Sequence, residues 1–215
     1  FFTYYRAGSA ASLMRPDDLP ADAIRAARCL HLSGITLAVS PDLRRTSLAA
    51  IDLAAEAGVT VSLDTNLRLK LWDAETARRV ILGTLERVRI VVTSIEDSLH
   101  LTGLGEPEAI GEFYRRRGPE IVLVTMGAQG CHLAGPAGVQ TIPAAPAQPV
   151  DSTGAGDSFA GGFLAWWLQT GDPVLAARRA AIIAAGTVSG LGAVAPIPRA
   201  AEVLAREAEL YGPAG

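Results

Sequence analysis

The segment Asp151-Ser152-Thr153-Gly154-Ala155-Gly156-Asp157-Ser158 carries the residue types with the clearest chemical potential in this chain. Gly154 and Gly156 can adopt backbone angles that are closed to other residues, and they let a ligand approach the main chain closely. The segment leads into an apolar run that predicts a buried helix. The first N–H groups of that helix lack intrahelical partners and lie at the positive end of its dipole, so the turn favours an anion.

Asp157 lies directly beside this predicted anion hole. A carboxylate is a poor choice for plain anion binding, because like charges repel. It suits a reaction that takes a proton from a hydroxyl while negative charge builds up on a phosphoryl group. The alternative is that Asp157 caps the helix N-terminus, as aspartate often does. The segment alone leaves both interpretations open.

Arg68 is a second candidate, within the pattern Asp64-x-Asn66-x-Arg68 that follows a predicted strand. A guanidinium at this place can hold a carboxylate or a phosphate through two parallel hydrogen bonds. The alternative is a structural ion pair with Asp64 or Asp73.

Tyr4, Tyr5 and Arg6 form a comparable cluster, whose hydroxyls and guanidinium suit a polyol acid. The same tripeptide could equally lie at the edge of a sheet.

The turn Gly127-Ala128-Gln129-Gly130 follows a predicted strand and could expose backbone amides to phosphates. The alternative is a hairpin turn that needs its glycines for conformation alone.

Composition bounds the class of protein. The 215 residues suffice for one large domain, and 49% hydrophobic against 19% charged residues is typical of a globular chain. A net charge of −3 predicts no nucleic-acid partner. Two distant cysteines make no disulfide scaffold, so we expect a reducing, cytoplasmic setting. We expect no signal peptide and no membrane span, because the uncharged run over residues 180–198 is rich in small and polar residues.

Strands that alternate with helices predict an α/β fold with a mostly parallel sheet. Ligands of such sheets bind at the carboxyl ends of the strands, so the polar clusters there and the turn before Asp157 could share one crevice. We expect a single domain over residues 1–215. The predicted strands are residues 1–6, 29–35, 59–64, 89–92, 120–125, 131–133 and 139–142, the last two as a hairpin. The predicted helices are residues 20–28, 42–57, 73–86, 94–101, 107–117, 157–169, 173–189 and 198–210.

The segment from Asp151 to Phe159 closely resembles the carboxyl-terminal signature of the ribokinase-like (PfkB) carbohydrate kinases. Tyr4-Tyr5-Arg6-Ala7-Gly8-Ser9-Ala10, His31-Leu32-Ser33-Gly34-Ile35 and Ser62-Leu63-Asp64-x-Asn66-x-Arg68-x-x-Leu71-Trp72 resemble one branch, the 2-keto-3-deoxygluconate kinases. The resemblance implies a ribokinase-like three-layer sandwich and the ATP-dependent phosphorylation of a sugar, 2-keto-3-deoxygluconate to its 6-phosphate. Alternatives are a fragment that binds nucleotide without kinase activity, and a kinase of a neutral sugar such as fructose or ribose.

The resemblance also implies roles for single residues and the cofactors ATP, Mg²⁺ and K⁺. Asp157 would be the base, with an anion hole formed by Gly154, Ala155 and Gly156. The sugar acid would meet Tyr4, Tyr5, Arg6 and Arg68. ATP would meet Ser94, Thr125, Gly127, Gln129 and Gly130, and a monovalent cation would meet Asp151 and Thr153.

This sequence also departs from the family pattern. Ser94-Ile95-Glu96-Asp97 stands where many members have Asn-x-x-Glu, a motif implicated in Mg²⁺ and phosphate handling. Members carry a further N-terminal portion with sugar-binding glycines and a small β-sheet lid, which we expect to be missing from this chain. We also expect that the protein could form a homo-oligomer.

Overall fold

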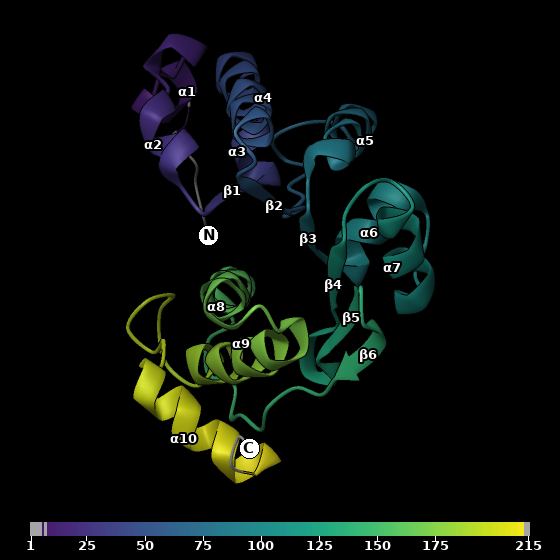
Figure 1. Cartoon of the computed structure of the whole chain (residues 1–215), viewed down its shortest axis with the longest axis vertical. Coiled ribbons are helices and arrows are strands. Elements are labelled where there is room, and N and C mark those ends of the chain that lie inside the picture. Colours follow the sequence, from purple (N-terminus) through teal and green to yellow (C-terminus); the bar gives the residue numbers. More distant parts are fainter. Residues whose placement is uncertain (1–5, 7, 213–215) are drawn as a thin grey trace. The chain divides into compact units, whose positions relative to one another are not determined.

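The computed structural model describes residue 6 and residues 8–212, and it divides the chain into two compact units, residues 1–123 and 124–215 (Figure 1). Tyr4 and Tyr5, and with them most of the predicted first strand, lie outside the described residues. Within the described residues, no helix combines the length and the apolar character needed to cross a membrane. The expectation of a single domain stays a prediction.

The first unit is built on parallel strands. Strands β1 (Cys29–Ser33), β2 (Thr60–Asp64) and β3 (Ile90–Ser94) pair in parallel, with Leu30 opposite Val61 and Leu63 opposite Val91. Parallel neighbours need crossover connections, which α4 (Pro41–Glu56) and α5 (Ala74–Gly83) provide. The remaining helical segments are α1 (Ala10–Leu13), η1 (Pro16–Asp18), α2 (Ala21–Ala26), α3 (Gly34–Ala38), η2 (Leu85–Arg87), α6 (Ile95–Thr102) and α7 (Pro107–Arg115).

Strands and crossover helices share the apolar core of this unit. Leu63, Ile90 and Val91 are fully buried on the strands, as are Ile51 on α4 and Ile81 on α5. Removing such side chains from water is the main stabilising contribution to the fold. The chain passes from the first unit to the second along β4 (Ile121–Thr125).

The second unit begins with a hairpin and continues with three helices. The 3-10 turn η3 (Gly127–Gln129) precedes the antiparallel pair β5 (Cys131–Gly135) and β6 (Gly138–Ile142). Helices α8 (Ala155–Thr170), α9 (Pro173–Val188) and α10 (Ala200–Tyr211) follow. Figure 1 shows α8 and α9 side by side, where a Cβ at Gly162 would lie 2.6 Å from Cδ1 of Ile183. Glycine at this position therefore allows the two helices to pack closely.

The alternation of strands and helices, the parallel pairing and the hairpin confirm the predicted α/β class. The predicted strand over residues 29–35 was too long, because the chain turns directly from β1 into α3. Ser33 caps this helix by accepting a hydrogen bond from Ile35 N at 3.3 Å. The predicted helix over residues 157–169 starts two residues earlier, at Ala155.

Candidate functional site

The predicted anion hole is a glycine-led helix start. Gly154 is the N-cap of α8 in the left-handed conformation (φ 79°, ψ 3°), and no side chain caps the helix there. A Cβ at Gly154 would lie 2.7 Å from the Cβ of Ala193, so only glycine fits this close approach. A Cβ at Gly156 would meet no atom within 4 Å, so space is open beside the first turn. An uncapped helix start with open space beside it is suited to an anion.

Asp157 lies in the first turn of α8 and is exposed to solvent. The N-cap of this helix is Gly154, three residues earlier, so the alternative that Asp157 caps the helix is wrong. The carboxylate therefore lies at the solvent-facing start of α8, next to the open turn. An exposed carboxylate can take a proton from an incoming hydroxyl, and this role of Asp157 stays a prediction.

Asp151 ties the turn to a distant part of the same unit. Its Oδ1 accepts hydrogen bonds from Thr153 N at 2.9 Å and Thr153 Oγ1 at 2.7 Å, and its Oδ2 accepts one from Gly192 N at 2.9 Å. These donors stabilise the charged form, and they lower the pKa of Asp151 below its usual value. Asp151, Thr153 and the segment from Gly154 to Asp157 thus form one turn supported by the loop after α9.

The turn between β4 and β5 needs one of its glycines for conformation. Gly130 has φ 97°, and a Cβ there would lie 2.1 Å from the carbonyl oxygen of Ile142, so the hairpin itself requires this glycine. Gly127 and Gln129 are exposed, and a Cβ at Gly127 would meet nothing within 4 Å. Thr125 is the last residue of β4. Contact of these residues with ATP stays a prediction.

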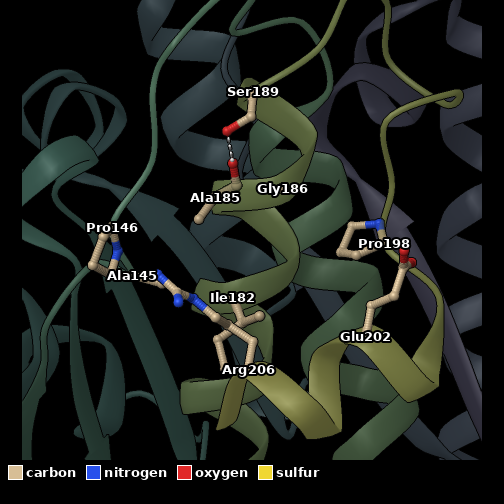
Figure 2. A pocket seen from close by; sticks show the side chains of 9 residues that line it. All are labelled: Ala145, Pro146, Ile182, Ala185, Gly186, Ser189, Pro198, Glu202 and Arg206. Carbon is tan, nitrogen blue, oxygen red and sulfur yellow. Dashed lines mark hydrogen bonds between the residues drawn. The ribbon is translucent and has the colours of Figure 1, made fainter. Parts of the chain in front are cut away.

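A pocket of about 280 Å³ lies in the second unit, between the segment that precedes the turn, the carboxyl-terminal half of α9, and α10. Its walls are mostly apolar, and Glu202 and Arg206 of α10 contribute opposite charges. In Figure 2 the Arg206 side chain extends toward Ala145 and Pro146, and Glu202 lies beside Pro198. The lining residues are Ala145, Pro146, Ile182, Ala185, Gly186, Ser189, Pro198, Glu202 and Arg206. None of these lining residues was predicted from the sequence, where only the Pro- and Ala-rich composition of residues 143–149 marks this part of the chain.

In the first unit, Arg68 is exposed on the loop after β2. Its Nη1 donates to the carbonyl of Leu67 at 3.1 Å, and no carboxylate among the described residues pairs with it. The predicted alternative of an ion pair is wrong, because Asp73 instead caps α5 through Thr76 N at 2.8 Å. Asp64 accepts a hydrogen bond from Asn66 N at 3.1 Å. The guanidinium is therefore available to an anion.

Ser94 and Asp97 have structural partners at the start of α6. Ser94 Oγ accepts a hydrogen bond from Asp97 N at 3.0 Å and caps the helix. Asp97 Oδ2 accepts hydrogen bonds from Thr65 Oγ1 at 2.8 Å and Leu67 N at 2.9 Å. We did not foresee these contacts, although the Ser-x-x-Asp spacing resembles a capping motif. Contact of Ser94 with ATP stays a prediction.

Arg6 is half-buried, and its carbonyl accepts a hydrogen bond from Ser9 N at 3.1 Å. Its predicted role in sugar binding stays a prediction, as do those of Tyr4 and Tyr5. Within the described residues, no cluster of three or more histidine, cysteine, aspartate or glutamate side chains could hold a metal ion.

The sequence and the structure of this chain both resemble those of known proteins. Residues 1–200 match the model of the family described as pfkB family carbohydrate kinase. The 2-dehydro-3-deoxygluconokinase of Thermoproteus tenax is 37% identical over 209 residues, which is 94% of this chain and 62% of the relative. Fructokinase-1 of Zea mays is 34% identical over 215 residues, which is 94% of this chain and 65% of the relative. The chain thus spans less than two thirds of either relative.

A solved structure is similar over most of the chain. The fructokinase of Vibrio cholerae O395, in a form with fructose, ADP and calcium ion bound, has a TM-score of 0.81 and is 28% identical. The alignment covers 92% of this chain and 66% of that one. The likeness agrees with the α/β architecture expected of a ribokinase-like fold.

Proposed function

This chain belongs to the pfkB family of carbohydrate kinases, and on that premise we propose that it transfers a phosphoryl group from ATP to the 6-hydroxyl of 2-keto-3-deoxygluconate. The observation that carries the acid-sugar assignment is the exposed guanidinium of Arg68, without a carboxylate partner among the described residues. A sugar carboxylate would satisfy it through two hydrogen bonds, whereas a neutral sugar needs no such cation. Arg6, Tyr4 and Tyr5 are the further proposed contacts.

The proposed chemistry is carried by the start of α8. Asp157 takes the proton of the sugar hydroxyl while the hydroxyl oxygen attacks the γ-phosphorus of ATP. The bond between the γ-phosphorus and the β,γ-bridging oxygen breaks as the new bond forms. The amides of the segment from Gly154 to Gly156 stabilise the negative charge on the transferring phosphoryl group. ADP and the sugar phosphate are the products, and the proton of the sugar hydroxyl is then held by the Asp157 carboxylate.

The nucleotide base is proposed to occupy the pocket of Figure 2. Its apolar walls suit a flat heterocycle, and the guanidinium of Arg206 could stack on such a ring. The lead-in segment that supplies Ala145 and Pro146 runs into Asp151, so one stretch of chain connects the pocket with the anion hole. Thr125, Gly127, Gln129, Gly130 and Ser94 are the other proposed nucleotide contacts.

The residues fit the two implied metal ions differently. Asp151 and Thr153 offer the oxygen atoms that a potassium ion prefers, and the pKa of Asp151 is already lowered, so its charged form is favoured. For magnesium the described residues offer no cluster of carboxylates, and a Mg²⁺ ion that arrives on the nucleotide phosphates needs none. When bound, it would neutralise charge on the β- and γ-phosphates.

A coupled assay of ADP release tests the proposal, with 2-keto-3-deoxygluconate, fructose and ribose as acceptors. We expect the acid sugar to be preferred in wild type, and the preference to vanish in Arg68→Gln. Asp157→Asn should lower turnover at least about 100-fold and leave ATP affinity unchanged, because only the base is removed. Turnover of neutral sugars alone would refute the acid-sugar assignment. ATP binding without turnover of any sugar would favour the nucleotide-binding fragment.

A further inference from the structure

We propose that Asp97 is a positioning residue, which holds the loop that presents Arg68 to the substrate. The proposal rests on the proposed function for the role of Arg68. The Asn-x-x-Glu motif of many family members, which is implicated in Mg²⁺ and phosphate handling, is replaced here by Ser94-Ile95-Glu96-Asp97. The carboxylate is instead engaged with the chain just before Arg68.

The contacts of Asp97 enclose the loop at two points. Its Oδ2 accepts hydrogen bonds from the side-chain hydroxyl of Thr65 at 2.8 Å and from the main-chain amide of Leu67 at 2.9 Å. The carbonyl oxygen of Leu67 in turn accepts a hydrogen bond from Arg68 Nη1 at 3.1 Å. The main-chain amide of Asp97 is itself fixed by Ser94 Oγ at 3.0 Å. A rigid helix start therefore holds the residue that directly precedes Arg68.

The backbone of the loop carries strain at the residue between those two points. Asn66 has φ 28°, the one positive φ of a non-glycine residue among those described. Such a conformation is unfavourable by itself and persists only where the surroundings impose it. Thr65 and Leu67, on either side of Asn66, are the residues that Asp97 holds.

The opposite side of the loop is also fixed. A Cβ at Gly34 would lie 1.9 Å from the carbonyl oxygen of Thr65, so the start of α3 packs directly against the loop backbone. Thr65 N donates to the carbonyl of Val92 at 2.9 Å. The loop is thus enclosed by β3, α3 and α6, and Asp97 supplies the charged contact.

A buried chain of hydroxyl groups leads to Asp97. Ser98 Oγ lies 2.9 Å from Thr93 Oγ1, which lies 2.9 Å from Thr65 Oγ1. All three residues are at most 1% exposed. Hydrogen bonds in such a setting are strengthened by the low local dielectric, and a carboxylate accepts them better than a neutral group. The network gives the carboxylate of Asp97 a structural role that involves no metal ion.

The test compares Asp97→Ala with Asp97→Asn, and uses Glu96→Ala as the matched control on the same helical turn, since Glu96 is exposed. The first readout is amide hydrogen exchange at Leu67, which needs no activity. Asp97→Ala should accelerate it about tenfold to a hundredfold, the loss expected for a hydrogen bond to a charged group. Asn retains an acceptor and should restore much of the protection, and Glu96→Ala should change nothing.

The second readout is kinetic. Asp97→Ala should lower the ratio of kcat/KM for acid over neutral sugar toward that of Arg68→Gln, with Asp97→Asn intermediate. The Mg²⁺ concentration for half-maximal rate should stay unchanged in both variants. A metal-ligand role would instead raise that concentration equally in Ala and Asn, because a neutral amide is a poor substitute for a carboxylate ligand.

Unchanged amide exchange at Leu67 in Asp97→Ala would overturn the proposal. An equal rise in the half-maximal Mg²⁺ concentration in Asp97→Ala and Asp97→Asn would also overturn it. If Asp97→Ala does not fold, Thr65→Val provides the same exchange test from the other partner. A wild type without preference for acid sugars would refute the proposed substrate, whereas the exchange result would still decide the role of Asp97.

Discussion

A buried ion pair between α9 and α10 allows a quantitative prediction. Arg179 Nε and Nη2 lie 2.8 Å and 2.7 Å from Glu207 Oε2, and both side chains are only 8% exposed. The Arg179 guanidinium also lies over the ring of Trp166, 4.2 Å from its centroid. Removal of one partner leaves the other charge buried without compensation, which costs much more than the loss of an exposed pair.

Glu207→Gln should therefore lower the free energy of unfolding by about 3–5 kcal/mol. For a chain of this size that corresponds to a fall in Tm of roughly 6–20 °C. The matched control is Glu209→Gln, whose partner Arg206 lies at 2.6 Å but whose side chains are 43% and 61% exposed. This change should cost at most about 1 kcal/mol.

Thermal and urea unfolding of both variants, with ATP titrations, provide the assay. Glu207→Gln should also weaken ATP binding, because α10 supplies Glu202 and Arg206 to the proposed base pocket. The double variant Arg179→Met, Glu207→Leu should regain most of the stability, since no buried charge remains. A loss in Glu207→Gln no larger than that in Glu209→Gln would refute the reasoning.

Two further predictions concern the turn before Asp157. Gly154→Ala should lower the free energy of unfolding by about 1–2 kcal/mol and reduce turnover, because the residue has a φ of 79° and a Cβ there would lie 2.7 Å from the Cβ of Ala193. A urea midpoint equal to that of wild type would contradict this prediction. The lowered pKa of Asp151 means that its contribution to stability is full above the unfolded-state pKa of about 3.9 and is lost as pH falls through the lower folded-state value. Asp151→Asn should therefore flatten the acid side of a plot of Tm against pH, and an unchanged acid limb would show that these hydrogen bonds do not persist.

Much of the fold follows from local sequence patterns. Alternating apolar strands and amphipathic helices predicted the α/β class, and the glycines around Asp157 predicted a helix start that the structure places at Ala155. The short α3 escaped prediction because a single cap, Ser33, turns the chain into a helix without a long apolar stripe.

The contacts that support the candidate sites depend on residues far apart in the chain. Asp97 and Thr65 are 32 residues apart, and Arg179 and Glu207 are 28 apart. Neither pair has a periodic signature, because their proximity arises only when helices and strands have packed. The alternatives weighed for Arg68 and Asp157 likewise depended on which neighbours the fold would supply.

The hydrogen bond between Asp151 and Gly192 joins residues 41 positions apart. At a synthesis rate of about 5–20 residues per second, roughly 2–8 s separate the addition of these two residues to a growing chain. During this interval the carboxylate of Asp151 has no distant partner, and the turn that precedes α8 is held by local contacts alone. The proposed phosphoryl-binding turn is therefore completed only after α9 has been made.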